Sequence, residues 1–232
     1  IIYLVVIMNF SCDARIDKYD WTYAEKKWAE AEKIEAEVTG AKISGPTFNV
    51  LDYNVVPDTD LLNTDPINEL ISLVSDKGGG VLRFPKGVYR TGGIILKDNI
   101  EINIQEGAVL KFSQNPVDYT PNVIGHWEGM EIYNFRAFIY SNGAKNIAIT
   151  GRGILDGNAG WDNWWSWSKN NLHKLKKNRP RLMEYNRSQV PVEKRNFGIG
   201  YHLRPNFIQT YKSEKITIQG VTLKNSPMWF IH

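Results

Sequence analysis

The pair Trp127-Glu128 places an aromatic ring beside a carboxylate. Aromatic faces offer stacking surfaces and carboxylates accept hydrogen bonds, so the pair is typical of a surface that holds a polar ligand such as carbohydrate. Arg204, next to Pro205, can grip a ligand carboxylate through a two-pronged hydrogen bond. Each residue has a structural alternative: Trp127 seals the flank of the fold, Glu128 pairs with a nearby arginine, and Arg204 forms an internal ion pair.

Residues 225–232 hold two further binding candidates, Trp229 and His232. Alternate side chains of a strand point to opposite faces, so Trp229 and Ile231 would share one face and Phe230 and His232 the other. One of these pairs then faces the core. We expect Trp229 and His232 to contribute to ligand binding; for His232 the alternative is a polar surface residue.

Asp156, which Gly157 follows, is a candidate for an acid–base role. A glycine-flanked aspartate after a strand more often closes a turn through its own hydrogen bonds, and we favour that interpretation.

Two adjacent segments have unusual compositions: residues 161–167 hold four tryptophans, and residues 169–195 hold nine Lys and Arg against two Glu. That basic segment carries +7, so the remaining chain carries +3 − 7 = −4. The tryptophans either stack on sugar rings or pack against one another in a folded loop. The basic segment is either a solvated surface loop or a surface that binds an acidic polymer. Nucleic acid is not an expected partner, because the chain has no nucleic-acid-binding motif.

Three similar segments, residues 99–110, 146–155 and 215–223, must position these side chains. Each has alternating apolar residues, a glycine and a second apolar strand. A short strand has one face to bury and glycine accepts corner angles, so the copies bury one another when they stack as rungs of a coil. The repeats predict an all-β fold, a right-handed parallel β-helix that binds extended ligands along an outer face.

Flanking patterns predict two helices and three regions. Residues 21–38 have an apolar stripe at helical spacing, which predicts an amphipathic helix that caps the first rung, and residues 39–46 form a linker. Asp65-Pro66 begins a short helix with an apolar face that reaches Val74. We expect residues 1–20 to be the end of a signal or lipoprotein peptide with a tether, 21–46 the helix and linker, and 47–232 the rungs.

The apolar run Ile1–Met8 is shorter than the roughly 20 residues that span a bilayer and resembles the end of a signal sequence. Cys12, the single cysteine, follows as in bacterial lipoprotein cleavage sites, although Asn9 departs from that pattern. Lipidation at Cys12 and plain signal cleavage therefore both stay open. Either predicts an extracytoplasmic protein (periplasmic, outer-membrane lipoprotein or secreted) that meets a membrane only through a lipid anchor.

An ordered series of motifs resembles the opening rungs of glycoside hydrolase family 28, the polygalacturonases and their pectin-cleaving relatives. The series covers about residues 48–232 and comprises Phe48–Tyr53, Gly78–Tyr89, Thr91–Leu96, Glu106–Leu110, Trp127–Gly129, Ile149–Gly157, Arg204-Pro205 and Asn225–His232. The resemblance implies a pectin-lyase-like solenoid, an acidic plant cell-wall polysaccharide of the galacturonan type as partner, and a monomer when full length. It also implies inverting hydrolysis with no metal or organic cofactor.

Three of the family's catalytic signatures, an Asp-Asp pair, a Gly-His-Gly and an Arg-Ile-Lys, do not occur in this sequence. The fourth, Asn-Thr-Asp, occurs only at residues 63–65, ahead of Asn225–His232, whereas in the family these signatures follow that segment. Hydrolysis of a glycosidic bond needs one carboxyl group to protonate the leaving oxygen and another to activate water. We therefore expect an N-terminal portion of such an enzyme, with catalytic residues C-terminal to His232, and no activity from these 232 residues alone.

Two alternatives remain open at this stage: a β-helical polysaccharide lyase, which would use Ca²⁺ and an Arg or Lys base, and a polysaccharide-binding β-helix without catalysis. The sequence decides neither the pectic polymer nor whether cleavage is internal or at chain ends.

Overall fold

The computed structural model describes residues 21–169 and 174–232. The chain divides into two units, one that ends at Thr39 and one that runs from Gly40 to His232. The first unit contains helix α1 (Trp21–Glu37), which confirms the predicted helix. No residue of α1 is buried, so that this helix caps the first rung stays a prediction.

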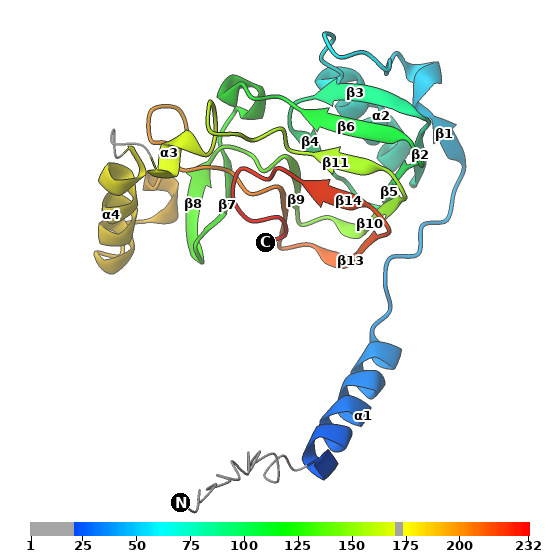
Figure 1. The fold of residues 1–232 in the computed structure, drawn as a ribbon, viewed down its shortest axis with the longest axis horizontal. Coiled ribbons are helices and arrows are strands. Elements are labelled where there is room, and N and C mark those ends of the chain that lie inside the picture. The colour runs from blue at the N-terminus through cyan, green and yellow to red at the C-terminus, as the bar shows by residue number, and fades with distance from the viewer. Residues whose placement is uncertain (1–20, 170–173) are drawn as a thin grey trace, which may run out of the picture. The chain divides into compact units, whose positions relative to one another are not determined.

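Three parallel sheets, which the chain enters in turn, form a coiled column within the second unit (Figure 1). The first sheet has the order β1-β2-β5-β10-β13, the second β14-β11-β6-β3 and the third β12-β9-β4; we call them sheets A, B and C. Their strands are β1 (Thr47–Asn49), β2 (Gly80–Phe84), β5 (Ile100–Ile104), β10 (Lys145–Gly151) and β13 (Glu214–Gln219) in A; β3 (Gly87–Thr91), β6 (Ala108–Phe112), β11 (Ile154–Asp156) and β14 (Thr222–Lys224) in B; β4 (Ile94–Ile95), β9 (Ile139–Asn142) and β12 (Ile208–Tyr211) in C. The predicted stack of parallel strands is therefore confirmed.

The three sequence repeats lie in register. Ile149 pairs with Ile102 on one side and Ile218 on the other, so equivalent residues of the repeats stack along sheet A. Each repeat begins with a residue in the left-handed region, at φ 57 for Asn99, 59 for Asn146 and 53 for Lys215. This conformation turns the chain from sheet C into sheet A, and asparagine tolerates it better than most residues.

Glycine occupies the corner between sheets A and B for a steric reason. Gly151 has φ 108, and a Cβ there would lie 2.0 Å from the carbonyl oxygen of Ile104. Only a residue without a side chain lets neighbouring rungs approach this closely.

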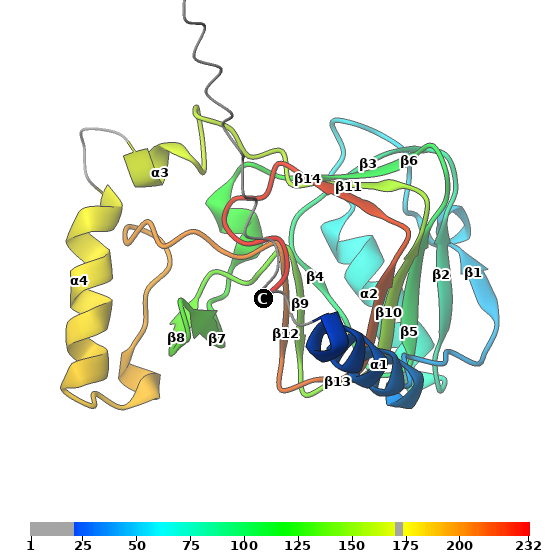
Figure 2. The ribbon, with the colours of Figure 1, turned by 60° about the horizontal axis from the view of Figure 1, so that its bottom comes forward.

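Sheets A, B and C surround the interior of the column (Figure 2). The main core of buried side chains lies in this interior. Inward side chains such as Ile102, Leu110 and Phe138 are fully buried there. Helix α2 (Thr64–Asp76) buries Ile67, Leu70, Ile71 and Val74 in the same core, as the predicted apolar face requires, but it begins at Thr64 rather than after Asp65. This helix covers the apolar interior beside the first rungs.

A second apolar cluster, the side core, lies outside the column. It contains Trp127, Ile132, Leu182, Phe197 and Leu203. These residues come from the antiparallel hairpin β7 (Val123–Trp127) and β8 (Met130–Asn134) and from the long segment between β11 and β12. That segment includes α3 (Ser166–Lys169), α4 (Lys174–Arg187) and the short 3-10 helix Val192–Lys194; two further 3-10 helices span Val50–Tyr53 and Pro116–Tyr119.

The tryptophan-rich segment joins the main core. Trp164 is 1% exposed and its ring lies 4.8 Å from that of Trp167, whereas Trp161 remains 54% exposed. For Trp164 the packing alternative is thus the observed one. No helix among the described residues is long and apolar enough to cross a membrane.

Candidate binding surface

Trp127 ends β7 and is covered by protein. Its side chain is 2% exposed within the side core, and its indole Nε1 donates a hydrogen bond of 3.0 Å to the carbonyl oxygen of Arg204. The stacking role expected from the sequence conflicts with this burial, because neither ring face reaches solvent. The structural alternative, that Trp127 seals a flank, describes the observed position.

Glu128 begins the hairpin turn with φ 48 and faces α4. Its Oε2 accepts a hydrogen bond of 2.7 Å from Nε of Arg179. The expected pairing with a nearby arginine is therefore present, and it ties the hairpin tip to the basic helix. Because the pair is partly exposed, its contribution to stability is modest.

Arg204 lies between the hairpin and residues 225–232. Its Nη1 donates a bond of 2.6 Å to the carbonyl oxygen of Pro227, while Nε is buried without a hydrogen-bond partner. Burial lowers the pKa of the Arg204 guanidinium. No carboxylate among the described residues lies within 4.0 Å of it, so the expected internal ion pair is not seen there. A half-buried cation without a counter-charge favours an anionic ligand.

Trp229 and His232 lie together, with ring centroids 4.7 Å apart. The alternation that placed them on opposite faces is wrong, because residues 225–230 do not form a regular strand and only Ile231 bridges to Ile208 of sheet C. Trp229 is 46% exposed, so part of its ring is open to a ligand. Both predicted residues are thus on one accessible surface.

Polar residues of sheet C and the hairpin lie around and beneath this surface, with Gln209 and Tyr211 buried under it. The His126 ring lies 5.2 Å from that of Tyr211 and 6.2 Å from that of His232. Tyr211 Oη donates a 2.5 Å hydrogen bond to Glu131 Oε1, and Nζ of Lys212 lies 4.0 Å from the same oxygen. We call His126, Gln209, Tyr211, Trp229 and His232, with the adjacent Glu131 and Lys212, the sheet C surface.

The charges of this surface follow from those contacts. The hydrogen bond from Tyr211, together with the charge of Lys212, holds the pKa of Glu131 below its ordinary value. Burial, helped by the neighbouring His126, lowers the pKa of His232. At neutral pH the surface therefore presents an ionised Glu131 and a neutral His232.

The sequence reasoning did not select Gln209, Tyr211, Glu131 or Lys212. The signal available was the period of two in β12, which puts Gln209 and Tyr211 on the same face. No sequence pattern linked β12 to the hairpin, because the contacting residues Tyr211 and Glu131 are 80 residues apart in the chain.

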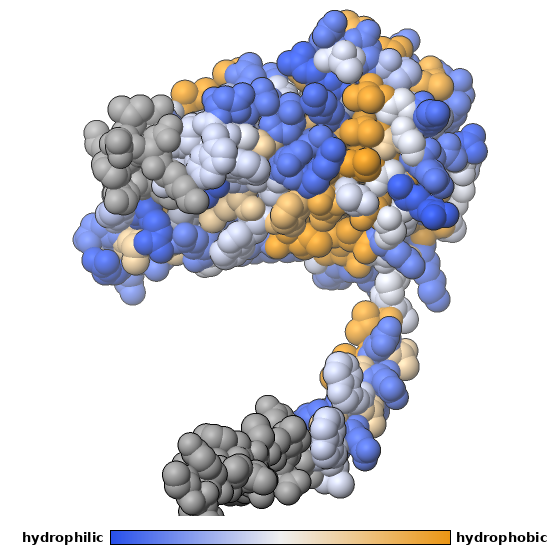
Figure 3. Space-filling view, in the orientation of Figure 1, coloured by the Kyte–Doolittle hydropathy of each residue, from blue (hydrophilic) through white to orange (hydrophobic). Residues whose placement is uncertain are grey.

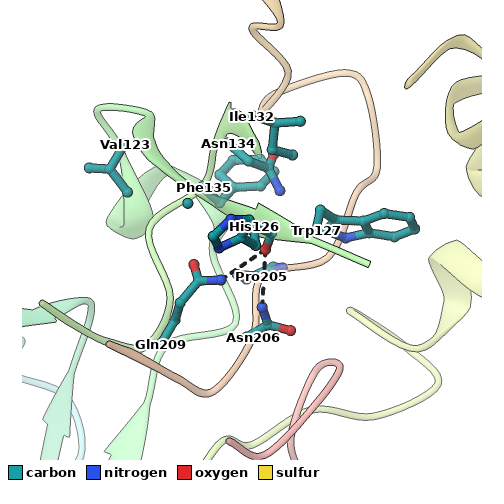
Figure 4. Close-up of a pocket in the computed structure, with 10 residues that line it drawn as sticks. Val123, His126, Trp127, Ile132, Asn134, Phe135, Pro205, Asn206 and Gln209 are labelled. Atoms are coloured by element: carbon teal, nitrogen blue, oxygen red, sulfur yellow. Dashed lines mark hydrogen bonds between the residues drawn. The ribbon is translucent and has the colours of Figure 1, made fainter. Parts of the chain in front are cut away.

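A small cavity lies beneath this surface (Figure 4). Its volume of about 10 Å³ suits one water molecule rather than a sugar. The amides of Gln209 and Asn206 both donate to the carbonyl oxygen of His126, at 2.8 and 3.4 Å. The hydrogen bonds that line the cavity therefore hold the hairpin in place, and the cavity is too small to be the ligand site.

Asp156 lies in sheet B, away from this surface. It accepts hydrogen bonds from the Asn158 backbone at 2.9 Å and from Asn225 Nδ2 at 2.8 Å, and it pairs with Lys224 at 3.3 Å. Burial would raise the pKa of Asp156, but the bonds from Asn225, Asn158 and Lys224 leave it lowered. The bond from Asn158 is the turn-closing contact favoured from the sequence, whereas Lys224 and Asn225 lie on and just after the neighbouring strand β14.

Cys12 and the apolar run before it lie outside the described residues. Within the described ranges, no group of three or more His, Cys, Asp or Glu side chains is arranged as metal ligands.

Comparison with known proteins gives consistent relatives, although no family model matches. The chain is 32% identical over 114 residues to an exo-poly-alpha-D-galacturonosidase of Dickeya chrysanthemi, covering 43% of this chain and 17% of that protein. It is 27% identical over 187 residues to a probable polygalacturonase of Vitis vinifera, covering 76% and 32%. The chain thus spans no more than a third of the length of these relatives.

Among solved structures, a hyperthermoactive exopolygalacturonase of Thermotoga maritima matches with TM-score 0.81 and 37% identity, over 86% of this chain and 47% of that one. A family 28 exopolygalacturonase of Yersinia enterocolitica matches with TM-score 0.58 and 24% identity, over 80% and 36%, and supports the fold alone. The resemblance inferred from the ordered motifs is confirmed. The chain is related to the polygalacturonases of glycoside hydrolase family 28.

Proposed function

We propose that this chain supplies rungs of an exported glycoside hydrolase that cleaves galacturonan-type pectic polysaccharide by inverting hydrolysis. The observation that carries the proposal is the match over 86% of the chain, at 37% identity, to an exopolygalacturonase. The sheet C surface supports it, because an exposed aromatic ring, hydrogen-bonding groups and nearby cations suit an acidic sugar polymer. Arg204, which donates to the carbonyl oxygen of Pro227 two residues before Trp229, and Lys212, which follows Tyr211, are the cations we propose to face the polymer.

The acid–base pair is proposed to lie outside these 232 residues. Inverting hydrolysis needs a protonated and an ionised carboxyl group about 6.5–9.5 Å apart. Glu131 is held ionised by Tyr211 and Lys212, and Asp156 is engaged in sheet B. Neither carboxyl group is therefore prepared to protonate a leaving oxygen at neutral pH.

An open apolar face supports further rungs on the column. Ile216, Ile218, Val221 and Leu223 pack against the main core yet remain partly exposed, and Phe230 and Ile231 are 43% and 56% exposed. Figure 3 shows apolar residues gathered on the side of the column where Figure 1 draws β13, β14 and the C-terminus. We expect strands of a following rung to pair with β13 and β14 and cover this face, because exposed patches and unpaired edges of this kind are normally protected.

Action at chain ends is the form of cleavage that the hairpin supports. Tyr140 and Tyr211, both 4% exposed, pack beneath Val123 and Ile124 of the hairpin, and Tyr140 Oη donates to the Ile124 carbonyl oxygen at 2.6 Å. A polymer that follows sheet C past Trp229 and His232 would meet this hairpin and stop. Two relatives are named as exo-acting enzymes, which agrees with such a stop.

Product analysis of the full-length protein tests this function. We expect polygalacturonate to yield new reducing ends, one small product from the outset, and no unsaturated, ultraviolet-absorbing product, with or without chelator. The chain of 232 residues alone should release nothing. Unsaturated products that depend on Ca²⁺ would replace the hydrolase with the lyase alternative, whereas polymer binding without any cleavage would favour the non-catalytic β-helix.

The remaining features of the proposal concern the N-terminus and the assembly. We propose that the protein is exported and that Cys12 is acylated. We also propose that the region boundaries fall after residues 20 and 46, and that the full-length protein is a monomer. Mass spectrometry of the mature protein would show either a diacylated or triacylated Cys12 as its first residue or an unmodified N-terminus.

A further inference from the structure

Gln209 holds two parts of the sheet C surface together. Its amide nitrogen lies 2.8 Å from the carbonyl oxygen of His126 and 3.0 Å from Nδ1 of His232. Its side chain is 7% exposed, so its two N–H groups must find partners within the protein. The two distances account for both donors.

The direction of the amide is fixed by chemistry. The His126 carbonyl oxygen can only accept a hydrogen bond, so the Gln209 nitrogen, and not its oxygen, must face it (Figure 4). The second N–H of the same nitrogen then points at His232. Because that nitrogen has no acceptor capacity, Nδ1 of His232 must be the unprotonated, accepting atom.

We propose that Gln209 is a positioning residue that holds His232 as the neutral tautomer protonated at Nε2, so that the ring presents a hydrogen-bond donor beside Trp229. The ligand side of this inference rests on the proposed function, since the acceptor would be a hydroxyl or ring oxygen of the sugar stacked on Trp229. Burial of His232 and the charge of His126 on β7, whose ring centroid lies 6.2 Å from that of His232, both oppose protonation of His232 and lower its pKa.

Gly125 leaves the room that this amide needs. A Cβ at Gly125 would lie 2.4 Å from Oε1 of Gln209 and 3.2 Å from its Cδ. The φ of Gly125 is not in the left-handed region, so alanine is compatible with the backbone there and only the flexible amide has to move. Gly125→Ala therefore displaces the Gln209 amide without altering Gln209 or either histidine.

The test compares four forms of the full-length protein: wild type, Gly125→Ala, Gln209→Ala and the control Gly40→Ala. The control also meets the end of a side chain, because a Cβ at Gly40 would lie 2.6 Å from Oγ1 of Thr217 in sheet A. With ¹⁵N in histidine and glutamine, wild type and control should show a scalar coupling across the hydrogen bond between Gln209 Nε2 and His232 Nδ1. Both other variants should lose it, and the pKa of His232 should rise in them, because a bond accepted by Nδ1 favours the neutral ring.

Calorimetric titration with tetragalacturonate provides the second arm. Gly125→Ala and Gln209→Ala should weaken binding about three- to tenfold, the effect of one misplaced hydrogen bond, and the control should bind as wild type does. A wild-type His232 that is protonated at Nδ1, or that lacks the coupling, would overturn the inference whatever the binding shows. A coupling that is present while no form binds the oligosaccharide would instead overturn the proposed function.

Discussion

Replacing Trp127 separates the structural role seen here from the sugar-stacking role that its sequence context suggests. The indole is 2% exposed, fills the side core and donates to the Arg204 carbonyl oxygen. Truncation of a buried tryptophan to alanine costs about 3–5 kcal/mol. Trp127→Phe keeps an aromatic ring but leaves the Arg204 carbonyl unpaired, which costs about 1–3 kcal/mol. We therefore expect stability to fall in the order wild type, Trp127→Phe, Trp127→Ala.

The loss should be local. The side core is separate from the main core, so the weakened contacts belong to β7, β8 and α4 and not to the column. Regions of a protein open with different free energies, and hydrogen exchange measures each of them. In Trp127→Ala, amide exchange should accelerate in the hairpin and in residues 178–187 while β5 and β10 keep their protection.

Trp229→Ala is the matched control for the same residue type. Trp229 is 46% exposed and contacts His232, so its truncation should cost roughly 1 kcal/mol or less in stability. It should instead weaken binding of galacturonate oligomers. The reasoning is refuted if Trp127→Ala leaves hairpin exchange unchanged and abolishes oligomer binding, because that result would require an accessible ring.

Three other substitutions follow from the contacts described. Tyr211→Phe should raise the pKa of Glu131, as an NMR titration would show. A carboxyl pKa that is lower in the folded state stabilises the protein at pH values above the unfolded-state pKa, and this stabilisation is lost as pH falls through the folded-state pKa. The difference in stability between wild type and Tyr211→Phe, measured by urea unfolding, should therefore disappear in acid. Arg204→Met should leave urea stability nearly unchanged, because it removes an uncompensated half-buried charge, yet weaken oligogalacturonate binding about tenfold or more by calorimetry. Gly151→Ala should cost about 1–3 kcal/mol more than Gly143→Ala in urea melts; both have positive φ, but only Gly151 faces a backbone atom at 2.0 Å, and equal costs would contradict the close-packing argument.

The column could be predicted from sequence because its determinants are local. Each rung carries its own alternating strand and its own corner glycine, and the copies at residues 99–110, 146–155 and 215–223 then align in register. The left-handed residues that begin the repeats were not predicted. Asn99 and Asn146 are types that favour such a turn, and Lys215 is not, so only the common position in all three repeats could have revealed the corner.

The candidate surface was predicted only in part, since its burial depends on distant residues. Leu182, Phe197 and Leu203 cover Trp127 and so keep it from facing a ligand. These three residues lie in the long segment between β11 and β12, which has no repeat pattern. Trp229 is 46% exposed and lies beside His232, and that these two residues bind substrate stays a prediction. Their relative orientation was predicted wrongly, because strand alternation fails where the backbone is irregular. The two-residue alternation of a strand predicts side-chain orientation only where the backbone is a regular strand.

The two cores are connected at the binding surface, and this has a functional consequence. Gln209 belongs to sheet C of the column, yet its amide is held by the backbone of the hairpin, which the side core supports. Arg204 likewise joins Trp127 of the side core to Pro227 beside Trp229. A change in the side core should therefore move the groups that contact ligand even where no ligand touches it. In the full-length protein, loosening the hairpin should weaken oligomer binding while the column retains its stability, because the two responses depend on separate sets of packed residues.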